Sequence, residues 1–138
     1  MLDYAANAKK DSMLNTPPVF AVYVSMLTLE WMKNNGGLPW IEKINEMKSS
    51  TFYTELDHNP LFVGPIAKEF RSDMNATFLL KNEKIAPEFE KMLKEAGISG
   101  LKGHRSVGGY RASMYNALPL ESVKVLVSVM KDLANKFG

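Results

Sequence analysis

The chain has 138 residues, of which 46% are hydrophobic and 23% charged, a composition typical of a soluble globular protein of one domain. Its net charge of +2 is unevenly divided: residues 1–70 carry six basic and eight acidic side chains, and residues 71–138 carry eleven and seven. Cysteine is absent, which excludes disulfides, thiolate nucleophiles and metal centres built on cysteine. Because His58 and His104 are the only histidines, we expect no metal site.

The strongest apolar run, Val19–Met32, is too short to span a membrane. It covers 14 residues and contains Ser25, Thr28 and Glu30, whereas a spanning helix needs about 20 apolar residues. The first residues lack the order of a signal peptide, and we expect the chain to begin inside a longer protein. The small net charge and the lack of a basic–aromatic platform disfavour nucleic-acid binding. We therefore expect a cytoplasmic protein with neither membrane nor nucleic acid as a partner.

The first part of the sequence predicts an extended segment followed by two long helices. Residues 7–12 are polar and are expected to be extended. Asn15-Thr16-Pro17-Pro18 is a helix-start signal, since Asn or Thr can cap the first amides and Pro is tolerated there. The run Val19–Lys33 predicts a helix buried nearly all round. Trp31 and Trp40 lie on helical stripes, and we expect both in the core. A second helix is predicted over Leu38–Leu56, with one face made of Trp40, Ile41, Ile44, Met47 and Thr51.

The remainder predicts short strands and two amphipathic helices. Strands are predicted over Leu61–Val63, Met74–Leu80, Ile98–Lys102 and Tyr110–Tyr115. The helix with Pro87 in its first turn has an apolar stripe and a C-terminal glycine, namely Phe89, Met92, Leu93, Ala96 and Gly97. The last helix starts at Pro119, and its apolar face comprises Val123, Leu126, Val127, Met130, Leu133 and Phe137. Two long helices followed by a small sheet with covering helices predict an α+β fold.

One segment of the chain is free of carboxylates and rich in cations. No Asp or Glu occurs from Ala96 to Leu120, and two of the three arginines, Arg105 and Arg111, lie there with His104. Guanidinium groups grip carboxylate or phosphate with two donors, and the interleaved glycines allow close backbone approach. In the predicted strand, alternation places Arg111 on the face opposite Tyr110. The segment therefore favours binding of an anion.

Each of these features also has a purely structural interpretation. Gly103–Gly109 can be a hairpin loop whose His104 and Arg105 are merely solvated, and Arg111 can simply cover a strand surface. Asn15 and Thr16 can be a helix cap, or their side chains can hold an anion, since Pro17 and Pro18 offer no N–H group. Asp57-His58 is typical of a helix end rather than of a catalytic pair.

Two long segments resemble one enzyme family closely. They are Asn15–Phe20, with the sequence NTPPVF, and Gly103–Ala117, with the sequence GHRSVGGYRASMYNA. Arg71–Asn75 and Pro119–Val123 also fit the family, and the similarity runs in order along the whole chain. On these motifs the chain resembles the phosphoserine aminotransferases.

The resemblance implies a class-V, fold-type-I aminotransferase that uses pyridoxal phosphate and acts as a homodimer. Such enzymes exchange an amino group between glutamate and 3-phosphohydroxypyruvate, giving 2-oxoglutarate and phosphoserine, in serine biosynthesis. By resemblance, residues 1–37 would end the large cofactor-binding domain and residues 38–138 would form the small domain. Asn15 and Thr16 would bind the cofactor phosphate across the dimer interface. His104 and Arg105 would bind the substrate phosphate, and Arg111 the α-carboxylate.

The resemblance covers only the C-terminal part of these longer enzymes. The part without a counterpart here holds the lysine that forms the Schiff base with pyridoxal phosphate, and the groups that contact its ring. None of the lysines in this chain matches the Schiff-base motif, so we expect no catalytic residue in it and no activity from the isolated chain. Its partner would be the missing N-terminal portion. The alternative is a non-enzymatic anion-binding α+β module.

Overall fold

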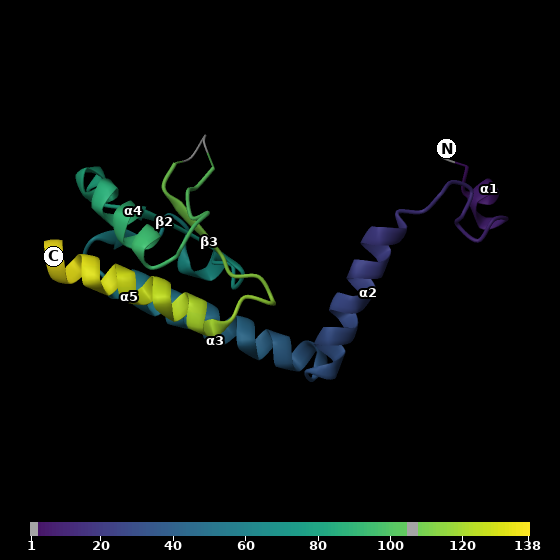
Figure 1. Ribbon diagram of the computed structural model, residues 1–138, viewed down its shortest axis with the longest axis horizontal. Helices are drawn as coiled ribbons and strands as arrows, with labels where there is room; N and C mark the ends of the chain where they lie inside the picture. Colours follow the sequence, from purple (N-terminus) through teal and green to yellow (C-terminus); the bar gives the residue numbers. More distant parts are fainter. Residues whose placement is uncertain (1–2, 105–107) are drawn as a thin grey trace. The chain divides into compact units, whose positions relative to one another are not determined.

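A computed structural model describes residues 3–104 and 108–138 (Figure 1). The chain divides into two compact units, residues 1–40 and residues 41–138. In chain order the helices and strands are α1 (Tyr4–Ala8), α2 (Val19–Asn34), α3 (Gly37–His58), β1 (Phe62–Val63), β2 (Asn75–Leu80), α4 (Ala86–Glu95), β3 (Tyr110–Ser113) and α5 (Leu120–Phe137). Short 3-10 turns occupy Lys68–Phe70 and Glu83–Ile85. The assignment of residues 1–37 to a cofactor-binding domain stays a prediction.

The first unit begins with a helix where the sequence predicted extended chain. The Asp3 carboxylate caps α1 by accepting the N–H groups of Ala5 and Ala6 at 2.9 and 3.2 Å. An aspartate in this position satisfies amides that would otherwise lack an acceptor, which stabilises a first turn even in a polar segment. The prediction of an extended segment over residues 7–12 is therefore wrong at its start, since α1 runs to Ala8.

Helix α2 forms as predicted, but its cap and its burial differ. Its N-cap residue is Pro18, and no side chain caps it, so the expected capping by Asn15 or Thr16 is wrong. No residue of α2 is buried among the described residues, so the expectation of a helix buried nearly all round is also wrong. A unit of 40 residues contains too little chain to enclose a helix of 16 residues.

The two tryptophans form a pair rather than part of a core. Trp31 is 38% exposed, and its ring meets that of Trp40 edge to face with centroids 5.4 Å apart. The expectation that both rings lie in the core is therefore wrong. The pair packs the end of α2 against the first turn of α3 within residues 1–40.

Helix α3 buries a different face from the predicted one. It runs from Gly37 to His58, and its buried residues are Ile41, Lys48, Ser49, Phe52 and Leu56. Of the predicted face only Ile41 is buried, while Met47 is 41% exposed. A lysine and a serine in the middle of the buried face conceal it from a hydrophobic pattern, since lysine is rarely buried.

The second unit contains a three-stranded antiparallel sheet of order β1-β2-β3. In its register Asn75 lies opposite Ser113, and Phe78 opposite Tyr110. Three of the four predicted strands are confirmed, with bounds that differ by one or two residues. The predicted strand Ile98–Lys102 is wrong, because only Lys102 forms an isolated bridge, to Tyr110. Gly100, at φ +76°, interrupts the extended conformation that a longer strand requires.

Helices α3, α4 and α5 cover one face of this sheet (Figure 1). The centre of the core is Phe78, which is fully buried and whose ring lies 5.2 Å from Phe52 and 5.9 Å from Phe62, both edge to face. On its other side Tyr110 stacks on Phe78 with centroids 5.4 Å apart and ring planes 24° apart. The small sheet covered by helices confirms the predicted α+β fold.

The buried apolar faces of α4 and α5 do not extend to the C-terminal ends that the sequence predicted. Gly97 has φ +75° and follows α4, and the next N–H group, of Ile98, donates to the Leu93 carbonyl at 2.8 Å. This is the Schellman arrangement, so the predicted C-terminal glycine is confirmed. Ala96 and Phe137, which were expected on buried faces, are exposed because each lies at or beyond the last turn of its helix.

Two glycine substitutions separate backbone strain from steric overlap. Both Gly97 and Gly109 have positive φ, but a Cβ on Gly97 would meet nothing, whereas one on Gly109 would lie 2.9 Å from the Phe78 carbonyl oxygen. We expect Gly97→Ala to destabilise the chain by about 1 kcal/mol and Gly109→Ala by about 2–4 kcal/mol. Urea unfolding followed by circular dichroism measures both values. An equal loss for the two variants would contradict the overlap at Gly109.

Candidate functional site

The carboxylate-free segment forms a hairpin that ends on the sheet. The Arg111 N–H group donates to the Leu101 carbonyl at 2.7 Å, and the Gly103 N–H group donates to the Gly109 carbonyl at 2.8 Å. Near the loop, the Gly108 N–H group donates to the His104 carbonyl at 2.9 Å. Arg105, predicted to bind phosphate, lies outside the described residues. Among the described residues, the segments 101–104 and 108–111 are thus joined by hydrogen bonds as the two arms of a hairpin are.

Strand β3 places Arg111 on the outward face of the sheet. Tyr110 and Ala112 are buried, and Arg111 and Ser113 are exposed, as strand alternation predicts. Burial, together with the charges of Glu90 and Glu83, raises the pKa of Tyr110 to about 12, so its phenol stays neutral in the core. The buried ring on Phe78 therefore fixes the direction in which the next side chain, Arg111, leaves the strand.

Arg111 lines a cavity of about 390 Å³ beside β3. Residues 96–101 form one wall, and the region around the start of α5 forms another. Three hydroxyl groups line it as well, those of Ser99, Ser113 and Ser122. Among the described residues no carboxylate pairs with Arg111. A guanidinium group without a described counter-ion, beside hydroxyl donors, suits a carboxylate ligand.

His104 lines a different cavity, of about 420 Å³, so the structure does not bring it into one pocket with Arg111. Its other lining residues include Glu83, Glu90 and Lys102. Lys102 pairs with Glu90 at 3.2 Å, which offsets one of the two negative charges. His104 itself is exposed. Because Glu83 and Glu90 line its pocket, this pocket is less cationic than the sequence segment alone indicates. Its role toward phosphate stays a prediction.

A chain of hydrogen bonds among Ser113, Asn75 and Tyr115 lies near Arg111. The Ser113 hydroxyl donates to the Asn75 side-chain oxygen Oδ1 at 3.1 Å, and the Asn75 side-chain nitrogen Nδ2 donates to the Tyr115 hydroxyl at 3.3 Å. Hydrogen bonds from Asn75 and Ser113, and then the charge of Arg111, lower the pKa of Tyr115. The sequence pointed to the motif Arg71–Asn75 only through the family resemblance. The structure shows that its last residue joins the face that carries Arg111.

Sequence reasoning also missed Lys48, which is fully buried on α3. Its ammonium group donates to the carbonyls of Met114 and Tyr115, each at 2.8 Å. Burial lowers the pKa of this ammonium group. The one signal in the sequence was helical spacing. Lys48 lies seven residues after Ile41 and four residues before Phe52, which places the three side chains on one face of α3. Lys48 thus ties α3 to the chain that leaves β3.

Asn15 and Thr16 lie in the first unit, in the exposed segment before α2. Neither side chain makes a hydrogen bond to a described residue, so a hydroxyl and an amide are available to a ligand. The two prolines that follow lack N–H groups, so backbone donors contribute little here. This donor set fits the phosphate end of pyridoxal phosphate, but it offers nothing to the ring.

The polar residues around Asp57 serve the fold instead. Arg71 donates to both carboxylate oxygens of Asp57, at 3.0 and 2.7 Å, and Lys68 pairs with it at 2.8 Å. The Arg71 guanidinium also lies over the Tyr53 ring, 4.7 Å from its centroid. The neighbouring His58 ring contacts the Thr54 carbonyl at 2.7 Å. The two side chains of the Asp57-His58 pair thus engage different partners, as expected at a helix end.

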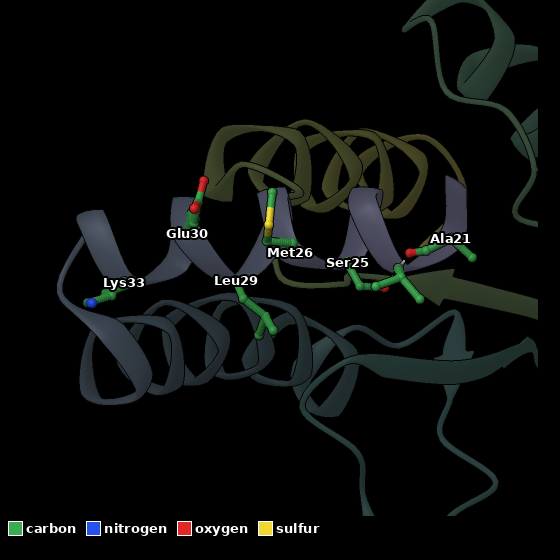
Figure 2. A pocket seen from close by; sticks show the side chains of 7 residues that line it. Ala21, Ser25, Met26, Leu29, Glu30 and Lys33 are labelled. Atoms are coloured by element: carbon green, nitrogen blue, oxygen red, sulfur yellow. Dashed lines mark hydrogen bonds between the residues drawn. The ribbon is translucent and has the colours of Figure 1, made fainter. Parts of the chain in front are cut away.

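A larger hollow, of about 530 Å³, runs along α2 (Figure 2). All of its lining residues belong to this one helix, and most are apolar: Ala21, Val22, Ser25, Met26, Leu29, Glu30 and Lys33. It therefore lacks the converging polar groups that orient a small ligand.

Within the described residues no group of three potential metal ligands occurs, and no helix is both long and apolar enough for a bilayer.

Residues 1–126 match the family model of aminotransferase class-V. The phosphoserine aminotransferase of Flavobacterium psychrophilum is 63% identical over 99% of this chain, and that of Porphyromonas gingivalis is 50% identical over 99%. The chain spans only 38% of the length of each, as a C-terminal part.

Solved structures agree with these relatives. The phosphoserine aminotransferase of Bacillus circulans subsp. alkalophilus superposes with a TM-score of 0.89 at 41% identity, over 98% of this chain and 38% of that one. A phosphoserine aminotransferase from Trichomonas vaginalis described as bound to pyridoxal phosphate gives a TM-score of 0.84 at 39% identity, over 94% and 37%.

The ion cluster at Asp57 predicts a specific pH dependence of stability. Hydrogen bonds from Arg71 and then Lys68 lower the pKa of Asp57 to about 2. A carboxyl whose pKa is lowered on folding stabilises the fold above its unfolded pKa of about 3.9 and loses that contribution as pH falls through about 2.

We expect Asp57→Asn to lower the free energy of unfolding by about 1 kcal/mol at pH 7, because water screens the partly exposed pair, and by less near pH 2. Urea unfolding at both pH values measures this difference. Asp132→Asn, on an exposed position of α5, is the matched control and should change little. A loss for Asp57→Asn that stays constant down to pH 2 would refute the proposed linkage.

Proposed function

Because this chain belongs to the class-V aminotransferase family, we propose that it forms the C-terminal part of a phosphoserine aminotransferase. The full enzyme would transfer an amino group between glutamate and 3-phosphohydroxypyruvate in serine biosynthesis. It would act as a cytoplasmic homodimer. The observation that carries this proposal is Arg111, which β3 holds outward in a segment without carboxylates.

The proposed role of the chain is to recognise the anionic groups of the substrate. The α-carboxylate is common to glutamate and phosphoserine, and a planar guanidinium such as Arg111 can bind both of its oxygens. The hydroxyls of Ser99 and Ser122, in the same cavity, offer further donors. His104 and Arg105 would contact the phosphate that distinguishes phosphoserine from glutamate. The chain would thus orient the substrate for a reaction whose covalent chemistry lies elsewhere.

Asn15 and Thr16 would hold the phosphate of pyridoxal phosphate through their side chains. When bound, pyridoxal phosphate supplies an electron sink for charge that develops at the substrate α-carbon. We propose that the lysine that links it to the protein, and the groups that contact its ring, come from an N-terminal part. The chain described here would therefore supply binding energy and orientation but no covalent step.

A hybrid enzyme tests this proposal. The N-terminal part of the F. psychrophilum enzyme is joined to this chain in place of its own matching segment. We expect the hybrid, with pyridoxal phosphate, to convert phosphoserine and 2-oxoglutarate, and the isolated 138-residue chain to convert neither. Turnover by the isolated chain, or a hybrid that holds pyridoxal phosphate without turnover, would contradict the proposal. An isolated chain that binds phosphate while the hybrid stays inactive would favour the anion-binding module.

In the hybrid, Arg111→Lys should weaken both amino-acid substrates. Lysine replaces a two-pronged donor by a point charge, and a charged hydrogen bond contributes about 2–3 kcal/mol. This loss corresponds to about 30- to 150-fold in kcat/KM for glutamate and for phosphoserine alike. Lys131→Met, which removes an exposed cation on α5, is the control and should change either value little. Unchanged glutamate kinetics in Arg111→Lys would show that Arg111 only covers the strand.

Substitution of the phosphate-reading residues should separate the two substrates. Arg105→Ala in the hybrid removes a charge-assisted contact, so kcat/KM for phosphoserine should fall by about 10- to 150-fold, and that for glutamate by less. His104→Ala should act in the same direction with a smaller effect. Steady-state assays of both half-reactions measure the ratio. Equal losses for the two substrates would remove both residues from phosphate recognition.

A further inference from the structure

Lys48 is a buried cation that the proposed function does not use. It lies in the middle of α3 with no exposed surface, and its two hydrogen-bond partners are backbone carbonyls. No ion pair with a carboxylate of the described residues accompanies them. Burial of an ammonium group without a counter-ion is costly, and an apolar side chain of similar volume often serves stability as well. The role of Lys48 is therefore to be sought in the two backbone carbonyls that it binds.

Those groups belong to the chain that leaves β3. The Met114 and Tyr115 backbone carbonyls both accept from the Lys48 ammonium at 2.8 Å, and the Asn45 side-chain nitrogen Nδ2 donates to the Asn116 side-chain oxygen Oδ1 at 2.8 Å. Three consecutive residues, 114–116, are thus held by two residues one helical turn apart on α3. We call these contacts the α3 clamp.

Backbone hydrogen bonds to Met74 and within the following turn also hold these residues. The Met114 N–H group donates to the Met74 carbonyl at 2.8 Å, and the Leu118 N–H group donates to the Tyr115 carbonyl at 2.8 Å. Met114 therefore has its N–H group on the sheet and its carbonyl on α3. Together these bonds fix where β3 ends and where the chain turns toward α5.

The position of Arg111 depends on this end of the strand. Arg111 lies three residues before Met114, a distance of about 10 Å along an extended strand. A slip of one residue in the β2–β3 register would turn Arg111 toward Phe78 and bring Ala112 outward. Displacements of only about 1 Å at a binding group can strongly weaken a reaction that depends on orientation.

We propose that Lys48 is a positioning residue for Arg111, acting through the α3 clamp on the end of β3. This inference rests on the proposed function, in which Arg111 binds the substrate α-carboxylate. Lys48 itself touches no substrate in this account. Methionine at position 48 would fill a similar volume but leave the Met114 and Tyr115 carbonyls without this donor, which frees the end of the strand.

The first test uses the 138-residue chain and does not depend on activity. Amide hydrogen exchange is followed by NMR in Lys48→Met and in Lys43→Met, a matched control at an exposed position of the same helix. In Lys48→Met we expect protection of the Arg111 and Met114 amides to fall about tenfold or more, with amides in the middle of α5 changed less than about twofold. An equal loss in β3 and α5, or no loss in β3, would overturn the proposal.

A second variant covers the case in which Lys48→Met does not fold. Asn45→Ala removes one contact of the α3 clamp and leaves Lys48 in place. It should lower protection of the same β3 amides by a smaller factor than Lys48→Met. If Asn45→Ala leaves these amides fully protected, the clamp does not hold the strand end and the proposal fails.

The hybrid enzyme separates positioning from general stability. Lys48→Met should raise KM for glutamate and phosphoserine together, by about 5- to 20-fold, with kcat changed by less than about threefold. In an Arg111→Ala background the same substitution should have no further effect on KM, because its influence passes through Arg111. Additive losses would overturn the proposal. If the unsubstituted hybrid is inactive, the proposed function fails while the exchange result still decides the clamp.

Discussion

The stacking of Tyr110 on Phe78 is the contact on which the rest of the second unit depends. Phe78 is fully buried among rings from α3, β1 and α4, and Tyr110 adds β3 to this cluster with its ring 5.4 Å away. A strand side chain that is buried forces its neighbours outward. The core therefore determines that Arg111 faces the surface, and Gly109 allows the chain to approach β2 closely enough for this pairing.

Two cations of this unit have opposite roles because their surroundings differ. Lys48 is enclosed and its donors are used on the backbone, so it serves the geometry of the chain. Arg111 is exposed and has no described counter-ion, so its donors are open to a ligand. In our account the first holds the strand end and the second reads the substrate. The matched relatives are longer than this chain, and we propose that both cations act within a full-length enzyme of that kind.

Local periodicity explains what the sequence predicted correctly. The alternation around Tyr110 and Arg111, the glycine that ends α4 and the stripe of α5 each depend on residues within a few positions of one another. The buried face of α3 was not predictable in this way, because Lys48 is buried only through carbonyls 66 and 67 residues away in sequence. The exposure of α2 likewise depends on how little chain surrounds it. For the site, alternation correctly predicted the outward position of Arg111, but not that His104 lines a separate cavity.

A crystal structure of the hybrid enzyme with phosphoserine bound tests the central claim most directly. The account predicts that the α-carboxylate lies within hydrogen-bonding distance of both terminal nitrogens of Arg111, that the phosphate contacts the hairpin around His104, and that Lys48 still binds the Met114 and Tyr115 carbonyls. A carboxylate held entirely by residues of the N-terminal part, with Arg111 in solvent, would contradict the assignment of this chain as the substrate-reading part of the enzyme.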